Sequence, residues 1–116
     1  MTEHSVQPAK AVVHFDISGP NEQDLHRFYG ELLDWQVDPK GPGYAQVQTP
    51  GGLRGAIVDG AQPGVTLGVL VPDLAAATAH AVELGGAVVM PPTNNGWVTK
   101  AQVKDPAGNV LTLIQG

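Results

Sequence analysis

The sequence contains no cysteine, which excludes disulfide bonds, thiolate metal sites and cysteine nucleophiles. Basic residues are scarce as well, because only 6 lysines and arginines stand against 11 aspartates and glutamates, for a net charge of −5. Proteins that bind a phosphate backbone usually carry a basic patch. We therefore expect no nucleic acid partner.

Long apolar runs are also missing. No stretch of the chain reaches the roughly 18 apolar residues that are needed to cross a bilayer. The opening residues, MTEHSVQPAK, lack the hydrophobic segment of a secretory signal. These features predict a soluble, cytoplasmic protein with no membrane partner, in which residues 1–10 form a flexible lead-in.

Glycine and proline, by contrast, are abundant. The 15 glycines and 10 prolines make up about twice the usual share of these residues, which predicts many turns between short elements and disfavours a helical bundle. Hydrophobic residues make up 42% of the chain, enough for an ordinary core. Since domains run to roughly 100 to 200 residues, we expect residues 1–116 to form a single domain.

An internal repeat is the most informative feature of the sequence. Residues 45–58, AQVQTPGGLRGAIV, match residues 101–114, AQVKDPAGNVLTLI, without a gap at an offset of 56, with five identities. Both segments predict a strand, a turn with proline and glycine, and a returning apolar strand. The same order of elements precedes each copy, so we predict two β-α-β-β-β modules, at about residues 11–59 and 64–115.

The elements that precede each copy are predicted from residue type and spacing. The upstream segments predict strands at 12–18 and 65–71, helices at 21–33 and 74–84, and short strands at 35–38 and 87–90. Asn21 and Asp73 are placed to cap the two helices. The first helix carries apolar residues at helical spacing: Leu25, Phe28, Tyr29, Leu32 and Leu33. The predicted inner face of the second consists of Leu74, Ala77, Ala81 and Leu84.

Alternation along the strands separates an apolar face from a polar one. Val13, Phe15 and Ile17 are expected to meet the first helix, which leaves His14 and Asp16 on the opposite face. The full second face is predicted to consist of His14, Asp16, Ser18, Tyr44, Gln46, Gln48, Arg54, Ala56, Thr66, Gly68, Lys100, Gln102 and Thr112. Two such sheets, each with its helix on one side, would place these polar faces against each other or around a space.

Several short motifs in the chain resemble those of one superfamily. The motifs are the strand at 14–18, Arg27-Phe28-Tyr29-Gly30, Leu33-Asp34-Trp35, and the turn Asp105-Pro106-Ala107-Gly108-Asn109. Together they resemble the vicinal-oxygen-chelate superfamily, which includes glyoxalases, bleomycin-resistance proteins, extradiol dioxygenases and fosfomycin-resistance enzymes. The resemblance spans about residues 11–115. It implies an α+β fold in which two tandem β-α-β-β-β modules form a cupped mixed sheet, with the helices on the outer face.

The resemblance also supplies a test for a metal site. Metal-dependent members of the superfamily place ligands on corresponding strands of the two modules, and those positions fall here on His14, Thr66, Ala56 and Thr112. Only His14 binds a divalent cation well, whereas a metal used for Lewis-acid chemistry typically needs three or more protein ligands. We therefore expect no cofactor, with a divalent metal held by ligands from elsewhere left open.

Individual residues of the polar face allow more than one interpretation. His14 and Asp16 are candidates for proton abstraction, or else form a hydrogen-bonded pair in a cavity wall. Arg54 and Lys100 either bind an anionic ligand or are surface charges near strand ends. Tyr44 either stacks on a planar ligand or closes the edge of a core.

The histidines outside this face, His26 and His80, are expected to be solvated or at a subunit contact, and we assign them no chemistry.

Three functions are compatible with this pattern. The first is a metal-independent small-molecule binding protein, similar to bleomycin-resistance proteins, that holds its ligand in the cup between the modules. The residues expected to contact the ligand are His14, Asp16, Tyr44, Gln46, Arg54, Thr66, Lys100, Gln102 and Thr112. The alternative is a lyase or isomerase that uses His14 with Asp16, or a metal enzyme with non-standard ligands. The third is a structural module that associates with another protein. The resemblance favours a homodimer.

Overall fold

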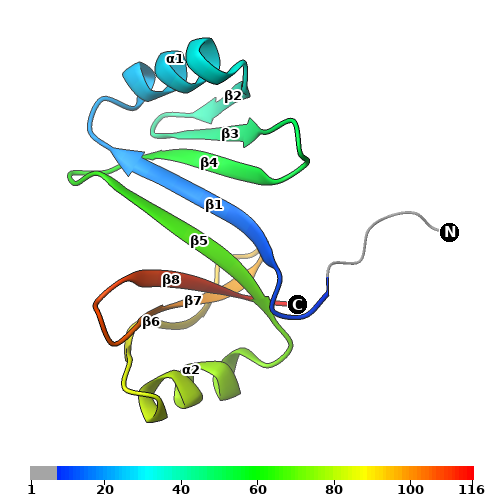
Figure 1. The fold of residues 1–116 in the computed structure, drawn as a ribbon, viewed down its shortest axis with the longest axis vertical. Helices are drawn as coiled ribbons and strands as arrows, with labels where there is room; N and C mark the ends of the chain where they lie inside the picture. The colour runs from blue at the N-terminus through cyan, green and yellow to red at the C-terminus, as the bar shows by residue number, and fades with distance from the viewer. Residues whose placement is uncertain (1–7) are drawn as a thin grey trace, which may run out of the picture. The chain divides into compact units, whose positions relative to one another are not determined.

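Each half of the chain consists of a strand, a helix and three further strands in a computed structural model that describes residues 8–116 (Figure 1). The elements of the first half are β1 (Val12–Gly19), α1 (Glu22–Leu33), β2 (Gln36–Gly41), β3 (Tyr44–Gln48) and β4 (Arg54–Asp59). Those of the second half are β5 (Gly64–Val71), α2 (Leu74–Glu83), β6 (Ala87–Asn94), β7 (Thr99–Lys104) and β8 (Val110–Gln115). The predicted β-α-β-β-β order therefore occurs twice.

The chain divides into two compact units. Residues 14–67 form one unit, and residues 68–116 form the other together with residues 8–13. Strands run in the order β2-β3-β4-β1 in the first half and β5-β8-β7-β6 in the second. The β1–β4 and β5–β8 pairs are parallel and the others within each half are antiparallel, so the sheet structure is mixed, as the α+β prediction requires.

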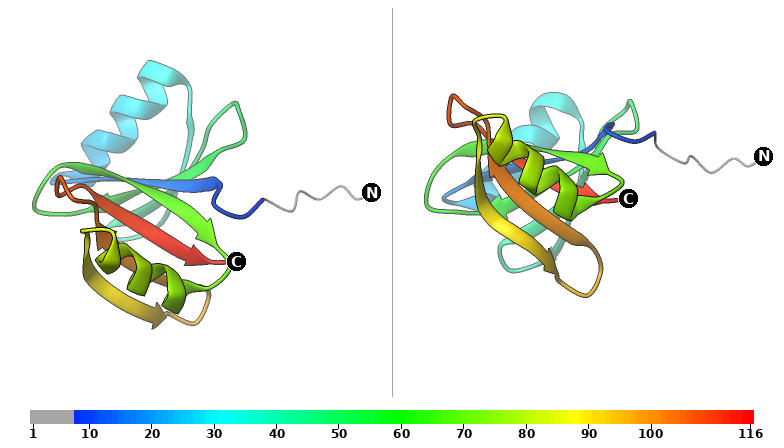
Figure 2. Two further views of the ribbon diagram at one scale, coloured as in Figure 1. Left: turned by 60° about the horizontal axis from the view of Figure 1, so that its bottom comes forward. Right: turned by 90° about the horizontal axis from the view of Figure 1, so that it is seen from below.

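Each helix packs on strands of its own half. Helix α1 contacts β2 and β4, and α2 contacts β6, β7 and β8. Figure 2 shows α2 lying across the strands of its unit. Neither of the two helices within residues 8–116 is long and apolar enough to cross a membrane.

Strand register confirms the internal repeat. Ala45 pairs with Ile57 in the first hairpin, and Ala101 pairs with Leu113 in the second, so both partners shift by the same offset of 56. In the parallel pairs, Asp16 lies beside Ala56 and Gly68 lies beside Thr112. Because a slip of one residue would move every side chain to the other face, this agreement means that equivalent positions face equivalent sides in the two modules.

The apolar face of each module forms a small core. Phe15 and Ile17 are buried with Val47 and Ile57, as the alternation along β1 predicts. The ring of Phe15 also contacts Trp35, with 5.7 Å between the ring centroids. In the other unit the buried cluster consists of Val71, Leu74, Ala101, Val103 and Leu113. Burial of these side chains stabilises each unit by removing apolar surface from water.

Helix α2 begins as predicted but ends one residue early. The Asp73 side chain accepts a hydrogen bond from the Ala76 N–H at 3.0 Å, which confirms its capping role. The prediction that Leu84 lies on the inner face is wrong, because this side chain is 65% exposed. The reason is that Leu84 is the C-cap, where the backbone leaves the helix before Gly85.

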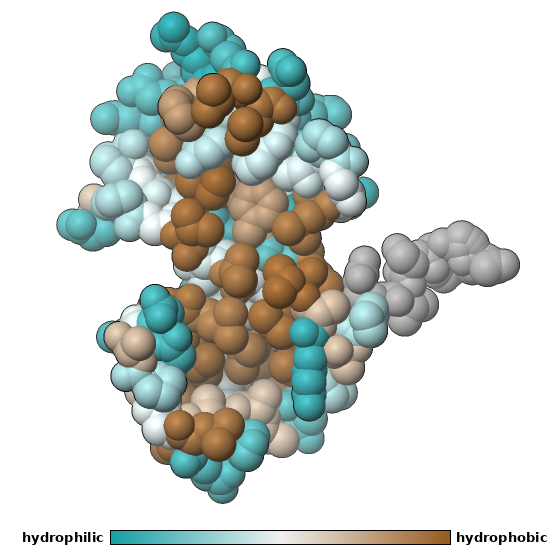
Figure 3. Space-filling model, in the orientation of Figure 1, coloured by the Kyte–Doolittle hydropathy of each residue, from teal (hydrophilic) through white to brown (hydrophobic). Residues whose placement is uncertain are grey.

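Helix α1 departs further from expectation. Asn21 precedes the helix in a left-handed conformation and makes no side-chain capping bond. Leu25 and Tyr29 pack against the core, whereas Phe28, Leu32 and Leu33 are exposed, with Leu32 at 62%. Hydrophobic surface is visible near α1 at the top of Figure 3. The apolar stripe of this helix is therefore wider than the surface that its own strands cover.

Strand β6 is longer than predicted because it continues through two prolines. The predicted strand ends at Met90, whereas β6 runs to Asn94 and includes Pro91 and Pro92. Its pairing with β7 shifts register between Met90 and Thr93. Proline cannot donate to a ladder and is tolerated at edge strands and bulges, and β6 ends the strand order of its half.

The Asp105-to-Asn109 turn between β7 and β8 is held by one carboxylate. Asp105 Oδ1 accepts the backbone N–H groups of Ala107 and Asn109 at 2.8 and 2.9 Å. Asp105 Oδ2 accepts the side-chain amide of Asn109 at 2.8 Å. Gly108 takes a positive φ of 101°, which favours glycine. The spacing of Asp, Gly and Asn in this motif thus serves the turn.

This carboxylate makes stability depend on pH. The hydrogen bond from the Asn109 side chain, followed by those from the backbone, lowers the pKa of Asp105 below its ordinary value of 3.8. Its contribution is therefore full above the unfolded-state pKa and is lost as the pH falls through the folded-state value. We expect Asp105→Ala to lower the Tm at pH 7, with the difference from the wild type narrowing as the pH falls from about 4 to about 2.

Thermal unfolding across this pH range measures the effect. Asp105→Asn is the matched control, because its amide oxygen can still accept the backbone N–H groups but carries no charge. Neither Asp105→Asn nor Asp105→Ala has an ionisable group at this position, so the difference between their Tm values should not change with pH. A wild-type advantage that persists undiminished to about pH 2 would contradict the assignment.

Candidate functional site

A hollow lies on the polar face of β1, β3 and β4, within the unit of residues 14–67. Its volume is about 170 Å³, and it is lined by His14, Tyr44, Gln46, Val47, Gln48, Arg54 and Gly55. Four of the predicted ligand-binding residues therefore come together here: His14, Tyr44, Gln46 and Arg54. We call this set of seven residues the hollow.

Strand register explains why these side chains meet. Arg54 pairs with His14 on one side, across the parallel β1–β4 ladder, and with Gln48 on the other, across the antiparallel β3–β4 ladder. The next row along the same face contains Asp16, Ala56 and Gln46. Neighbouring strands of a sheet lie about 4.7–4.9 Å apart, so each side chain of a row is within reach of the one on the adjacent strand.

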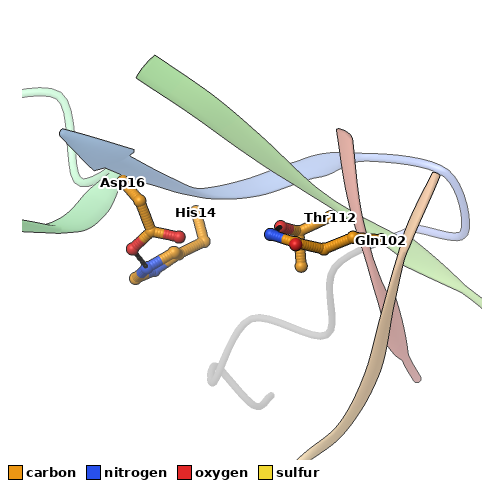
Figure 4. A network of polar contacts seen from close by, with 4 residues as sticks. All are labelled: His14, Asp16, Gln102 and Thr112. Atoms are coloured by element: carbon orange, nitrogen blue, oxygen red, sulfur yellow. Dashed lines mark hydrogen bonds and ion pairs between the residues drawn. The ribbon is translucent and has the colours of Figure 1, made fainter. Parts of the chain in front are cut away.

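His14 and Asp16 form a hydrogen-bonded pair on β1. His14 Nε2 lies 3.0 Å from Asp16 Oδ1, and both side chains are about one-third exposed. Figure 4 shows the ring and the carboxylate pointing toward one another. A carboxylate accepts hydrogen bonds, so the Nε2–H of His14 is the donor in this pair. The two side chains that strand parity places on one face are therefore in direct contact, and the second ring nitrogen of His14, Nδ1, takes no part in this bond.

The other polar residues of the hollow have no partner within residues 8–116. In that part of the chain the side chains of Tyr44, Gln46, Gln48 and Arg54 take part in none of the hydrogen bonds or ion pairs formed between residues. Tyr44 is half-buried, and the other three are exposed. Within the described part of the chain, no other side chain competes with a ligand for their hydrogen-bonding groups.

The remaining predicted site residues do not line the hollow. Gln102 and Thr112 hydrogen-bond to each other across β7 and β8, with the Gln102 amide nitrogen donating to the Thr112 hydroxyl at 3.2 Å (Figure 4). Thr112 is only 4% exposed. Lys100 on β7 and Thr66 on β5 are half-buried. A ligand cup between the two modules stays a prediction.

A second polar cluster, not predicted from the sequence, lies on α1. His26 Nε2 is 2.9 Å from Glu22 Oε2, and Glu22 Oε1 accepts the backbone N–H of Gly43 at 2.9 Å. The His26 side chain is 17% exposed, so it is partly buried and not fully solvated; its other expected place, a subunit contact, stays a prediction. The signal in the sequence is the Glu-x-x-x-His spacing, which places both side chains on one helix face. The pair ties α1 to the loop between β2 and β3.

The fold and its motifs match one known family. The profile of a family described as "Glyoxalase-like domain" matches residues 13–114, which is most of the chain. The chain belongs to this glyoxalase-like family. The resemblance drawn from the Phe-Tyr and Asp-Pro-x-Gly-Asn motifs is thereby confirmed. No protein with curated annotation matches the chain.

Solved structures share the glyoxalase-like fold at low identity. A glyoxalase/bleomycin resistance protein/dioxygenase superfamily member from Vibrio splendidus 12B01 superposes with a TM-score of 0.71 at 14% identity, over 93% of this chain and 100% of that one. Methylmalonyl-CoA epimerase from Mycobacterium tuberculosis gives 0.70 at 15% identity, over 97% and 93%. The Mn(II)-bound glyoxalase from Novosphingobium aromaticivorans gives 0.69 at 11% identity, over 92% of this chain and 39% of that one.

The residues of this glyoxalase-like chain do not fit a divalent metal at the expected positions. Ala56 offers no donor atom, and the Thr112 hydroxyl is buried against Gln102. Within residues 8–116 no three His, Cys, Asp or Glu side chains converge as a metal site would require. His14 and Asp16 supply two donors that already bond to each other. A catalytic metal needs about three protein ligands, so this pair alone does not make up a metal site.

Proposed function

We propose that this glyoxalase-like protein binds a small molecule in the hollow, and that binding needs no metal. The observation that carries the proposal is a convergence of polar side chains beside the His14–Asp16 pair. Four of them form no side-chain hydrogen bond or ion pair with residues 8–116: Tyr44, Gln46, Gln48 and Arg54. Ligand sites are typically concave and fix their ligand through a few convergent polar groups. The hollow combines both properties on strands, which hold side chains more precisely than loops do.

The volume of the hollow limits the size of a ligand that can fit entirely inside it. At about 170 Å³ it holds roughly the volume of five or six water molecules. Sites for drug-sized ligands usually measure roughly 300–1,000 Å³. The ligand is therefore a small metabolite, or a larger molecule that inserts one polar end.

A thermal-shift screen of small metabolites tests the proposal. Compounds that bind are expected to raise the Tm of the wild type, because a ligand that binds only the folded state stabilises it by mass action. His14→Ala should reduce that shift by at least half, since His14 lines the hollow. His80→Ala is the matched control, because His80 lies exposed on α2 and pairs only with Glu83 among the described residues; it should leave the shift unchanged.

Two results would count against the proposal. Equal loss of the shift in the His14 and His80 variants would place the ligand elsewhere. Stoichiometric nickel, zinc, manganese or iron in protein purified without chelator would contradict metal independence.

A second candidate function is proton transfer by His14 and Asp16. The 3.0 Å bond between them orients the ring and stabilises the imidazolium that forms when Nδ1 takes a proton, as in general-base catalysis. An isomerase or lyase of this kind would exchange a C–H proton of a bound compound with solvent. Deuterium wash-in that is present in the wild type and at least about tenfold slower in Asp16→Asn would favour the enzyme, whereas binding without exchange would favour the binding protein.

The homodimer and the cytoplasmic location stay predictions from the sequence.

A further inference from the structure

Arg54 lines the hollow, and no carboxylate of residues 8–116 forms an ion pair with it. Other cationic side chains of the same unit have carboxylate partners: Arg27 Nε lies 3.4 Å from Glu31, and Lys40 Nζ lies 2.8 Å from Asp38. Arg54 has no such partner within residues 8–116. The nearest carboxylate by register belongs to Asp16, which lies one row along and already bonds to His14. The guanidinium is therefore available to an anion.

The position of Arg54 in the sheet directs this charge into the hollow. Arg54 opens β4, and its register partners His14 and Gln48 flank it on both sides. The guanidinium presents its donors in a planar fork that matches the two oxygens of a carboxylate. The amide groups of Gln46 and Gln48 and the hydroxyl of Tyr44 line the same hollow and add neutral donors. A charged fork with neutral donors around it favours a small planar anion.

The overall negative charge of the chain limits the ways in which an anion could be drawn to the hollow. A net charge of −5 disfavours the approach of any anion at long range. A carboxylate held here must therefore depend on direct contact with Arg54, because general attraction to the protein is absent. Since the hollow has room for a carboxylate and a few further atoms at about 170 Å³, recognition would be confined to that end of the ligand.

We infer, resting on the proposed function, that the group bound in the hollow is a carboxylate, and that Arg54 recognises it through a bidentate ion pair. The carboxylate lies against the guanidinium, the amides of Gln46 and Gln48 donate to its remaining lone pairs, and the ring of His14 lies beside the atoms beyond it. Arg54 is thus the residue that determines specificity, while the His14–Asp16 pair fixes orientation.

The test is an NMR titration of the full chain with matched probes. Acetate, pyruvate and benzoate are compared with acetamide and benzamide, which have similar shapes but no charge. We expect the carboxylates to perturb the backbone amides of residues 14–16, 46–48 and 54–56 and to bind at least about tenfold more tightly than the amides. Arg54→Gln should weaken carboxylate binding by about tenfold or more and leave amide binding unchanged.

Two further variants separate charge from geometry. Arg54→Lys keeps the charge but loses the fork, so it should retain only part of the carboxylate preference. Lys104→Gln removes an exposed cation from the end of β7 in the other unit and should have no effect. Because Arg54 is exposed, its variants are expected to fold, which unchanged amide spectra outside the hollow would verify.

The outcomes distinguish this inference from the function on which it rests. Binding of amides and carboxylates at the hollow with equal affinity, unaffected by Arg54→Gln, would overturn the carboxylate assignment and leave small-molecule binding in place. Carboxylate binding that Lys104→Gln weakens as much as Arg54→Gln would overturn it as well, since the charge effect would then be general. If metabolites raise the Tm while no carboxylate perturbs the hollow, the inference fails alone; if nothing binds, both proposals fail.

Discussion

Replacing Ile57 with alanine is expected to lower the free energy of unfolding by about 3 kcal/mol, because the side chain is completely buried and its removal leaves a cavity. Ile57 lies in β4 between Phe15, Ile17 and Val47, so little else can move into the space. Urea denaturation followed by fluorescence measures the change. Val82→Ala on the exposed side of α2 is the control and should change the free energy by less than about 0.5 kcal/mol.

The same experiment on Leu74 tests whether the chain is one domain. Leu74 belongs to the buried cluster of the other unit, so Leu74→Ala should lower the free energy of unfolding by a similar amount, about 3 kcal/mol. If residues 1–116 form a single cooperative domain, as predicted, both variants shift one common transition. Two transitions, one moved by the Ile57 variant and the other by the Leu74 variant, would contradict the single-domain prediction.

Much of the fold was predictable because it depends on local patterns. Strand parity correctly assigned Phe15 and Ile17 to the core and His14 to the opposite face. The ungapped repeat predicted a common register for the two hairpins, which Ala45 and Ala101 confirm. Period-2 alternation and turn chemistry act over a few residues, so one sequence contains them in full.

What the sequence left open depends on long-range packing. The amphipathic spacing of α1 included Phe28 and Leu32, but how much of that stripe the strands cover is decided by the width of the contact with β2 and β4. The burial of His26 depends likewise on Glu22, which bonds to Gly43, 21 residues further along the chain. Helical spacing predicts a face but not the area that its neighbours bury.

The candidate site was likewise predictable from the sequence only in part. Parity placed His14, Tyr44, Gln46 and Arg54 on one face, yet it could not show that they are neighbours. That depends on the strand order, in which β4 lies between β3 and β1, although β1 and β4 are far apart in sequence. The sequence also could not show that Arg54 lacks an ion-pair partner among residues 8–116, because such a partner can come from any strand or loop.

Gly55, whose backbone lines the hollow, is expected to tolerate no side chain. Phe15 is its register partner on β1, and a Cβ at Gly55 would collide with the end of the Phe15 ring. That ring is buried and packs on Trp35, so it cannot move away cheaply. We expect Gly55→Ala to lower the free energy of unfolding by about 2 kcal/mol through overpacking. Gly51→Ala is the control, because a Cβ there meets nothing within 4 Å, and it should be neutral or slightly stabilising.

A double-mutant cycle identifies the cause. In a Phe15→Leu background the ring is gone, so Gly55→Ala should cost less than half of what it costs in the wild type, because contacting residues are coupled. If Gly55→Ala lowers the free energy of unfolding equally in both backgrounds, the backbone conformation at position 55, and not the Phe15 ring, requires the glycine. Arg54 precedes Gly55 in β4, and His14 precedes Phe15 in β1. Strain between residues 55 and 15 would therefore also displace Arg54 and His14. Carboxylate binding should then weaken in Gly55→Ala and recover in the Phe15→Leu/Gly55→Ala double variant. This result would show that packing in the core beneath the hollow determines the position of Arg54.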